Sequence, residues 1–371
     1  MRHYGPGGRE HGGGIGRFIG YVTDAASGSA TRHLVTDTRG PRWSPLASPA
    51  RLAGAMLATA RDRLLVPGRV HHIHLAGRGS TARKLLLTAW ARGLGCRHIL
   101  HLHDYDYASD VARRPPRYRA LIRRMFQGAD AVIVLGQHDR RLAVETLLSD
   151  PGKVAVFGNC VPDPGPPDYA RRDAAALRDG PTILFLGRLG PRKGVPELLE
   201  ALASPALSAL PWRAILAGDG PVEAYRQQAR DLGLDRRVEM PGWLDAEGAA
   251  ALCRRADILV LPSHAEGMAM AVLEGLAHGL AVVTTPVGAH GEVITDGVTG
   301  VFVAPGDAPG LAGALAALVR DPARRLAIAQ RGRALFLSRF GMAAYMARLD
   351  DLYDAVSRES RRSAATQGRG A

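Results

Sequence analysis

One stretch, residues 256–284, constrains the fold more than any other part of the chain. It opens with the apolar run Ile258–Leu261, which is typical of a buried parallel strand. A short polar loop follows, then an apolar stripe at helical spacing that ends at Gly279, and then a second apolar run. This order of strand, loop, helix and strand predicts an α/β fold with a parallel sheet. The helix would begin beside the carboxyl end of a strand, where its unpaired amides and positive partial charge suit a phosphate group.

Two glutamates bracket the predicted helix. Glu266 stands just before it, and Glu274 lies seven residues past Gly267, about 10 Å along a helix axis. The two carboxylates could therefore contact polar groups on either side of a bound phosphate. Taken singly, Glu266 also fits a helix-capping residue, and Glu274 fits a solvent-exposed helix position.

A second strand-to-helix turn carries a cluster of cations. Residues 182–186 predict a buried strand, residues 187–194 form a glycine-rich turn with Arg188, Arg192 and Lys193, and residues 196–202 predict a helix. Lysine is rare in this chain, where arginine supplies nearly all of the positive charge. Because a lysine ammonium is a compact point charge, a lysine on this turn suits a diphosphate oxygen.

Four motifs resemble glycosyltransferase family 4. They are the glycine-rich turn at 187–194, the segments 216–221 and 240–243, and the two glutamates with seven residues between them at 266–274. The resemblance covers most of the chain and is strongest from about residue 180 to residue 340. It implies an α/β fold of GT-B architecture, in which two Rossmann-like doubly wound domains face a cleft. It also implies a retaining enzyme that uses a nucleotide-diphospho-sugar.

The resemblance assigns roles to individual residues of this chain. Arg188 and Lys193 would stabilise the charge of the departing diphosphate, Glu266 would contact sugar hydroxyls, and Glu274 would hold the ribose hydroxyls. The remaining donor contacts are expected from Gly14, Gly16, Gly267, Met268 and Ala269. Gly14 and Gly16 belong to a glycine-rich segment that begins at Gly12.

A histidine at the end of a predicted strand completes the expected catalytic set. By the resemblance, His103 would approach the reacting carbon of the sugar; the alternative is a histidine whose hydrogen bonds are simply satisfied there. His101 and His103 lie two residues apart and hence on one face of a strand. No third ligand has suitable spacing, so we expect no metal and no cofactor. The D-x-D pattern at 104–106 matches the manganese motif of another glycosyltransferase fold, and we interpret it as incidental.

Alternating strands and helices predict two domains. Residues 1–165 would form an acceptor-side domain and residues 181–340 the nucleotide-sugar domain, joined by a proline-rich linker at 166–180. A helix at 341–356 would pack back across the domains, and residues 357–371 would be disordered. Chains of the family begin with a buried strand, and the polar, glycine-rich N-terminus offers none. We therefore expect the first strand to be missing, with the true start upstream or removed.

Charge and composition limit the classes of molecule that this chain is expected to bind. A net charge of +13 favours anionic partners, and nucleic acid is excluded because no nucleic-acid module or basic-aromatic pattern is present. Residues 112–126 set six arginines against four apolar side chains. This segment would either bind an anionic membrane surface or pack its apolar side on its own domain. With no long apolar run, no secretory signal and three scattered cysteines, we expect a cytoplasmic protein, peripheral on the inner face of the membrane.

These observations predict a function and leave two alternatives. The expected reaction is retaining transfer of a sugar from a nucleotide-diphospho-sugar to a hydroxyl of a glycan or lipid-linked acceptor, in the synthesis of surface polysaccharide or glycolipid. A nucleotide-sugar epimerase of the same fold, or a non-catalytic subunit of a polysaccharide assembly complex, are the alternatives. The intact set of Arg188, Lys193, Glu266 and Glu274 speaks against a non-catalytic subunit.

Overall fold

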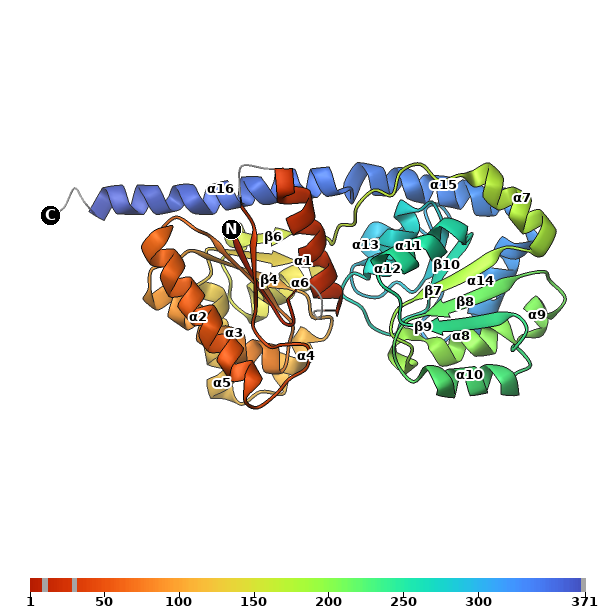
Figure 1. Ribbon diagram of the computed structural model, residues 1–371, viewed down its shortest axis with the longest axis horizontal. Helices are drawn as coiled ribbons and strands as arrows, with labels where there is room; N and C mark the ends of the chain where they lie inside the picture. Colours follow the sequence, from red (N-terminus) through yellow and green to blue (C-terminus); the bar gives the residue numbers. More distant parts are fainter. Residues whose placement is uncertain (9–12, 29–31, 368–371) are drawn as a thin grey trace. The chain divides into compact units, whose positions relative to one another are not determined.

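The structure is a computed structural model that describes residues 1–8, 13–28 and 32–367. The chain divides into two compact units, which Figure 1 shows in the colours of the sequence. Unit 1 comprises Met1–Cys160 and Met342–Ala371, and unit 2 comprises Val161–Gly341. Each unit is built on a parallel β-sheet covered by helices, as the alternating pattern of the sequence predicted.

The described residues of unit 1 form a six-stranded parallel sheet in the order β2-β1-β3-β4-β5-β6. Its strands are β1 (Arg2–Gly5), β2 (Leu34–Asp37), β3 (His71–Leu75), β4 (His98–Leu102), β5 (Ala131–Val134) and β6 (Val154–Val156). The chain leaves β1 for β2 on one side and then returns to β3 on the other. The connection therefore reverses direction between β1 and β3, at a topological switch point.

Strand β1 corrects the expectation that the first strand is missing. Arg2–Gly5 pairs in parallel with β2 on one side and β3 on the other, in the interior of the sheet. Its residues are polar, but their polar atoms have partners. The Tyr4 hydroxyl lies 2.8 Å from the Thr59 hydroxyl and 2.9 Å from Nδ1 of His71. Buried polar groups that are hydrogen bonded can replace an apolar strand, and periodicity cannot reveal partners from distant segments.

Helices cover both faces of the sheet in unit 1. The face with Tyr4, Ile73 and Leu100 packs against α2, α3 and α5, and the face with His72 and His101 packs against α1 and α16. The helices of this unit are α1 (Gly13–Ala25), α2 (Ala47–Leu65), α3 (Gly79–Gly93), α4 (Tyr107–Ala112), α5 (Pro116–Gln127), α6 (Gln137–Arg141) and α16 (Met342–Gln367). Short helical turns follow at η1 (Ala26–Gly28), η2 (Leu142–Thr146) and η3 (Pro151–Lys153).

Helix α16 corrects the expected disorder after residue 356. It runs without a break from Met342 to Gln367 and belongs to unit 1, where it lies beside α1 (Figure 1). Tyr345, Leu349, Tyr353 and Val356 are buried, at spacings of three and four residues that place them on one face. Once this face is docked, each further residue adds a backbone hydrogen bond, so polar residues can continue the helix. Residues 368–371 lie outside the described part of the chain.

Unit 2 contains, in its described residues, a second six-stranded parallel sheet, in the order β12-β11-β10-β7-β8-β9. Its strands are β7 (Thr182–Leu186), β8 (Arg213–Ala217), β9 (Val238–Gly242), β10 (Ile258–Leu261), β11 (Ala281–Thr284) and β12 (Val301–Phe302). The chain moves outward from β7 to β9 and then returns to β10 on the other side of β7. The switch point of this sheet therefore lies between β7 and β10.

The helices of unit 2 lie between these strands in the chain. They are α7 (Tyr169–Asp179), η4 (Pro191–Lys193), α8 (Val195–Leu202), α9 (Pro205–Ser208), α10 (Val222–Asp231), α11 (Ala246–Arg255), α12 (Met270–Ala277), α13 (His290–Val293), α14 (Ala308–Arg320) and α15 (Pro322–Arg339). Helix α14 packs on α8, and α15 packs on α12 and β11. The interior strands are apolar, so β7 and β10 bury Ile183, Leu184, Leu259 and Val260 completely.

Helix α7 replaces most of the linker that the sequence predicted at 166–180. Tyr169–Asp179 is helical and belongs to unit 2. The guanidinium of Arg172 is buried and donates hydrogen bonds to the carbonyl oxygens of Gly279, Cys253 and Arg254. A proline-rich and charged composition suggested a solvated connection, but these three bonds attach the segment to the body of unit 2.

The basic segment at 112–126 packs its apolar side into unit 1. Ile122, Met125 and Phe126 of α5 are buried in the core, whereas Leu121 is 48% exposed. Most of this apolar face is therefore occupied by its own unit, which was one of the two alternatives. Across the described helices, none combines the length and the apolar character needed to cross a membrane.

Candidate functional site

The predicted cationic turn and the Glu266 loop meet at the switch point of unit 2. The first follows β7 and the second follows β10, and these two strands are neighbours in the sheet. In open parallel sheets, ligands bind beyond the carboxyl ends of the strands at this point, because the connecting loops diverge there and leave a crevice.

Lys193 and Glu266 form the central contact of the site. The Nζ atom of Lys193 lies 2.5 Å from Oε1 of Glu266, and their side chains are only 14% and 9% exposed. Arg192 approaches the same carboxylate oxygen at 3.4 Å and donates a 2.7 Å hydrogen bond to the carbonyl of Ala265. One carboxylate therefore holds a lysine and an arginine at the end of β7, which leaves a net positive charge there.

Arg188 lies on the same turn but pairs elsewhere. Its guanidinium is 3.5 Å from Asp219, and both side chains are largely exposed. The turns after β7 and β8 lie against each other, since the amide of Leu189 donates to the carbonyl of Asp219 at 2.7 Å. A Cβ on Gly218 would collide with the carbonyl of Gly187, so glycine permits this approach. Among the described side chains, Lys193 thus reaches Glu266, whereas Arg188 of the same turn pairs with Asp219 of the neighbouring turn.

The loop before α12 is held by the turn that follows β11. The amide of Ala269 donates to Nε2 of His290 at 3.2 Å, and the carbonyl of Gly267 accepts from the amide of Ala289 at 2.8 Å. Helix α12 begins at Met270, so Gly267 and Met268 precede its first turn. The Ala269 amide, which was expected to contact a donor, is therefore bonded to an imidazole in this structure.

His290 and Gly288 are residues of this site to which the sequence assigned no role. His290 is buried, and burial lowers the pKa of its imidazole, which favours the neutral ring that accepts from Ala269. A Cβ on Gly288 would collide with the carbonyl oxygens of Glu266 and Gly267. Both residues follow a strand end, which is the signal that could have identified them.

Glu274 lies on α12 within unit 2 and is only 8% exposed. The alternative of a solvent-exposed helix residue is therefore wrong. Met268 and Ala269 are buried as well. A buried carboxylate beside a switch point is costly to desolvate and is typical of a binding residue.

The remaining expected residues belong to unit 1. Gly14 and Gly16 lie in the first turn of α1, and Gly12 falls outside the described residues. His103 directly follows β4, where its amide donates to the carbonyl of Leu75. Its Nε2 atom lies 3.0 Å from Nδ1 of His74.

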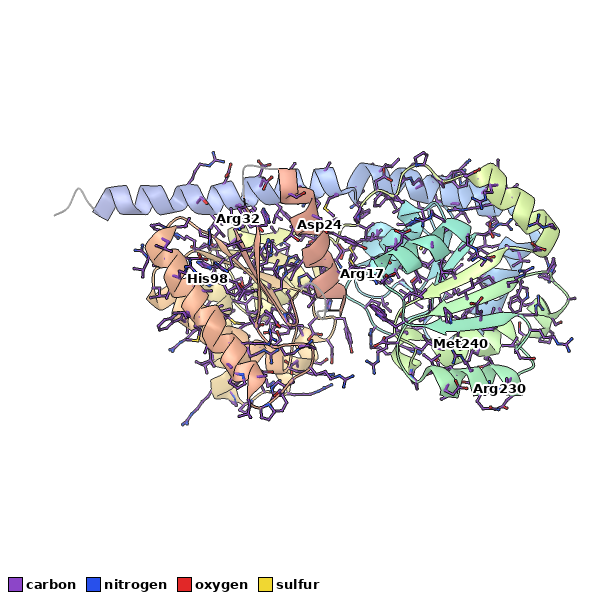
Figure 2. The ribbon with its side chains drawn as sticks, viewed as in Figure 1. Arg17, Asp24, Arg32, His98, Arg230 and Met240 are labelled. Atoms are coloured by element: carbon purple, nitrogen blue, oxygen red, sulfur yellow. The ribbon has the colours of Figure 1, made fainter. Side chains whose placement is uncertain are left out.

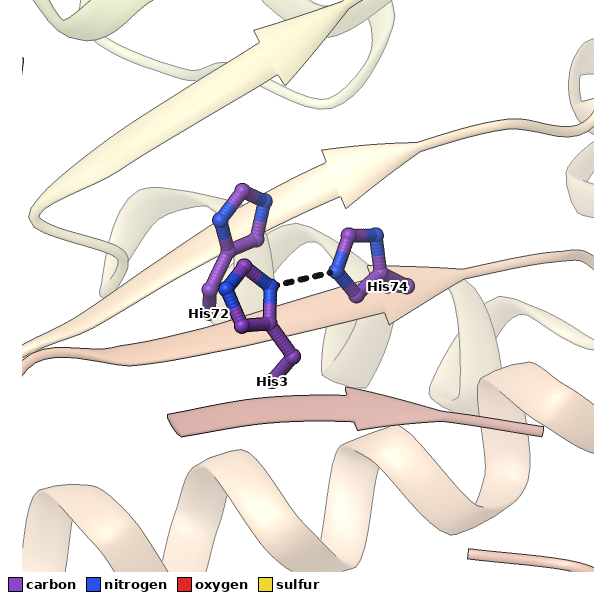
Figure 3. Close-up of side chains that lie close together, drawn as sticks. All are labelled: His3, His72 and His74. Atoms are coloured by element: carbon purple, nitrogen blue, oxygen red, sulfur yellow. Dashed lines mark hydrogen bonds between the residues drawn. The ribbon is translucent and has the colours of Figure 1, made fainter. Parts of the chain in front are cut away.

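His103 is one end of a cluster of histidines that the sequence did not predict. Imidazoles of β1, β3 and β4 share one face of the sheet because the parallel register places His3 beside His72 and His74 beside His101. Figure 3 shows His3, His72 and His74 together, with the hydrogen bond from His3 to His74 as a dashed line; that bond is 3.1 Å long. A second chain runs from Tyr353 through His72 to His101.

Burial keeps these imidazoles neutral. It lowers the pKa of His103 and of His72 to about 3, and it holds the pKa values of His74 and His101 well below their ordinary range. Charge on neighbouring histidines would lower the values of His72, His74 and His101 further. A neutral imidazole has one donor and one acceptor nitrogen, so rings can be linked nitrogen to nitrogen.

Two family matches cover most of the chain. Residues 180–321 match the glycosyl transferases group 1, and residues 20–160 match the glycosyl transferase 4-like domain. The chain therefore belongs to the group 1 glycosyltransferases, which are those of family 4. This assignment agrees with the resemblance that the sequence motifs showed.

Curated relatives of this glycosyltransferase include proteins of Mycobacterium tuberculosis and Mycolicibacterium smegmatis. It is 34% identical over 220 residues to a glycogen synthase of Mycobacterium tuberculosis, which covers 58% of this chain and 52% of that protein. It is 29% identical over 301 residues to the GDP-mannose-dependent alpha-(1-6)-phosphatidylinositol monomannoside mannosyltransferase of Mycolicibacterium smegmatis, covering 76% of each. The chain thus spans about half the length of the first of these relatives.

Solved structures show that the glycosyltransferase has the GT-B fold. A sucrose-phosphate synthase from Thermosynechococcus elongatus aligns with a TM-score of 0.73 at 20% identity, over 96% of this chain and 99% of that one. Alr3699/HepE of Anabaena, in complex with UDP-glucose, aligns with a TM-score of 0.74 at 18% identity, over 95% and 99%. At this level of identity the likeness concerns the fold alone.

Proposed function

We propose that this glycosyltransferase moves a sugar from a nucleotide-diphospho-sugar to a hydroxyl of a glycan or lipid-linked acceptor, with retention of anomeric configuration. The observation that carries the proposal is the ion pair of Lys193 and Glu266 at the switch point of unit 2. It holds an ammonium in place at the strand ends where such sheets bind nucleotides. The solved relative with UDP-glucose bound supports a donor of this class.

The proposed chemistry is electrostatic. Breaking the bond between sugar and diphosphate places negative charge on the leaving group, and Lys193, Arg188 and backbone amides near Gly267 and Met268 would stabilise it. These protein cations take the part that a metal plays in other transferases, so no metal is needed at the diphosphate. Because none of the residues expected at the site is placed as a nucleophile, the acceptor hydroxyl would attack from the leaving group's own side, and the departing phosphate would take its proton.

The other expected residues would bind substrate. Glu274 would accept hydrogen bonds from the ribose hydroxyls, and Glu266 would bind sugar hydroxyls while it orients Lys193. In unit 1, we assign Gly14 and Gly16 to the diphosphate and the acceptor, and His103 to the sugar. Ala269 would donate its amide to the donor only if that amide leaves His290.

The proposed acceptor is an intermediate in the synthesis of a surface polysaccharide or glycolipid at the inner face of the membrane. The mannosyltransferase relative is named for a phosphatidylinositol acceptor, which supports a lipid-linked hydroxyl. Arg113, Arg117, Arg123 and Arg124 on and beside α5 are exposed, so they could meet anionic headgroups even though the apolar face is buried. Each such arginine is worth about 1 kcal/mol near an anionic surface.

The test is nucleotide release from a panel of nucleotide-sugars, with and without glycan and lipid-linked acceptors. We expect one donor to release nucleotide strongly only when an acceptor is present, and an α-linked donor to give an α-linked product. An inverted product would contradict retention. Turnover of the donor without any acceptor would indicate an epimerase or a hydrolase instead.

A further inference from the structure

The imidazole face of unit 1 is chemically unusual for the interior of a parallel sheet. Such strands are ordinarily apolar on both faces, as β7 and β10 are in unit 2. Here His3, His72, His74 and His101 are each completely buried. Because a buried imidazole must find partners for two nitrogens, this face needs an explanation beyond packing.

We propose that His74, His101 and His103 form a binding site for a divalent transition metal, with zinc as the first candidate. One ring nitrogen from each of the three lies within 4.8 Å of one ring nitrogen of the other two. Three imidazole nitrogens are a ligand set that suits zinc, cobalt, nickel or copper. The proposal concerns unit 1 alone and does not depend on the proposed function; with the ion on Nε2 of His103, only Nδ1 of that ring is left for the sugar contact proposed for it.

The nitrogens of His74 and His103 already lie close to the separation that a shared ion requires. Nδ1 of His74 and Nε2 of His103 are 3.0 Å apart. Two nitrogens bound to one tetrahedral zinc, at about 2.0–2.1 Å from it, lie about 3.3 Å from each other. The rings of His101 and His103 are stacked with their centroids 3.9 Å apart, so His101 is already beside this pair.

An unpaired nitrogen distinguishes this trio. Nε2 of His101 is buried and has no hydrogen-bond partner among the residues that the structure describes, while Nδ1 of the same ring lies 3.1 Å from His72. A buried polar atom without a partner destabilises the folded state, and a metal ion would remove this cost. His103 is only partly buried, which provides a path for the ion from solvent.

A second trio, His3, His72 and His74, also brings its nitrogens within 4.8 Å. Every nitrogen of that trio already has a partner: His3 lies between His33 and His74, His72 between Tyr353 and His101, and His74 between His3 and His103. These bonds satisfy the second trio without a metal. We therefore place the ion with His101 and His103.

The outer nitrogens of two proposed ligands are supported by further histidines. With a metal on Nδ1 of His74, its Nε2–H donates to His3; with a metal on Nε2 of His101, its Nδ1–H donates to His72. Such hydrogen bonds select the tautomer and orient the ring of a metal ligand. The rings are also neutral, as ligation requires, and Phe18 covers them at centroid distances of 5.3–6.0 Å.

The experiment measures metal content in full-length protein without a polyhistidine tag. The protein is stripped with a chelator, dialysed against zinc, and analysed for bound zinc; a parallel sample receives cobalt. We expect one equivalent of tightly bound zinc per chain, visible absorption typical of tetrahedral cobalt, and a higher melting temperature with zinc. Wild-type protein that binds no stoichiometric zinc and shows no change in melting temperature would overturn the proposal.

Single variants identify the ligands. His101→Asn and His103→Asn should abolish stoichiometric binding, and His3→Asn should weaken it by about 10- to 100-fold. His98→Asn is the matched control: His98, labelled in Figure 2, is also buried and lies on the same strand, β4, but three residues before His101 and hence on the other face of the sheet. It should keep full binding.

Folding is checked for each variant by thermal unfolding. If His101→Asn or His103→Asn does not fold, X-ray absorption of zinc in the wild-type protein counts its imidazole ligands instead, and three are expected. Zinc bound through sulfur or carboxylate, or binding that survives both substitutions and is lost in His3→Asn, would overturn the assignment. None of these measurements uses sugar transfer, so they remain informative if the proposed function fails.

Discussion

The two units use the same kind of sheet in opposite ways. Both have a parallel sheet whose chain reverses direction beside its first strand, at β1 and β3 in unit 1 and at β7 and β10 in unit 2. In unit 2 the interior strands β7 and β10 are apolar, and the charged residues of the site lie on the loops that follow them. In unit 1 the polar groups lie within the strands themselves, where imidazoles and a tyrosine bond to one another.

The two units therefore show two roles of polar residues: binding groups on loops at the edge of the core, and hydrogen-bonded groups inside the core. Loop cations such as Lys193 can be changed with little effect on the core, because they pack at its edge. Strand imidazoles such as His72 are part of the core, so they carry stability and function together.

Lys193→Ala should abolish most sugar transfer and leave unit 2 folded. Loss of one cation that stabilises the leaving group lowers kcat by about 100- to 1000-fold. Lys153→Ala, which removes an exposed lysine of η3 in unit 1, is the control and should be fully active. Steady-state kinetics and melting curves measure the two effects. Full activity of the Lys193 variant would refute its assigned role.

Gly288→Ala should damage the site without touching its charges. The added methyl group collides with the backbone of Glu266 and Gly267 and would shift the loop, and a displacement of about 1 Å can cost about 100-fold in rate. Gly297→Ala is the matched control: this glycine also has a positive φ, of 69°, but open space around its Cβ position. Both variants carry the backbone strain of about 1–2 kcal/mol, and only Gly288→Ala should lose donor binding in calorimetry.

Acid should unfold unit 1 before unit 2. Burial lowers the pKa of His71 to about 4 and that of His72 to about 3, below the unfolded value of about 6.5. As the pH falls below about 6.5, the unfolded chain binds protons that the folded unit does not. Each such histidine then removes about 1.4 kcal/mol of stability per pH unit until its folded pKa is reached.

Hydrogen exchange of metal-free protein between pH 7 and pH 4 measures this loss separately in peptides of each unit. In unit 2 the pKa values of His278 and His290 are lowered in the same way, so its stability should also fall, but less. Equal losses in the two units would contradict the comparison.

The smallest effect is expected at α16. Tyr353→Phe removes the hydroxyl that lies 2.6 Å from Nδ1 of His72, which should cost unit 1 about 1–3 kcal/mol, because that nitrogen stays buried. Tyr345→Phe is the matched change, since its buried hydroxyl has no hydrogen-bond partner within the described ranges. It should be neutral or stabilising. Urea unfolding measures the free energy of unfolding of both variants; equal losses would contradict the role given to the Tyr353 hydroxyl.

Most strands of both sheets could be predicted from the sequence, because parallel strands are short apolar runs between glycine-rich turns. β7, β10 and β11 lie where periodicity placed them. β1 was missed, because a polar strand becomes stable only through Thr59 and His71, which are distant in the sequence. Helix α7 was missed for a related reason: the carbonyl partners of Arg172 come from another part of unit 2.

The candidate site was predicted in part. Glycine-rich turns after two strands indicated Lys193 and Glu266, and the structure joins them. Arg192 was recognised as a cation of the first turn but received no role, and His290 was not recognised; their importance comes from the carboxylate and the amide that they contact. The pair His101 and His103 was noticed, but the third imidazole, His74, lies on the neighbouring strand, where sequence spacing carries no information.

The sequence by itself determined the fold class, the family and the two loops that carry charge, because these follow from periodicity, glycine positions and local motifs. Only the tertiary structure decided which polar residues share an environment. The register between parallel strands is set by packing across the whole sheet. It brought six histidines onto or beside one face of the sheet in unit 1. It also left one ring nitrogen of His101 without a hydrogen-bond partner among the described residues.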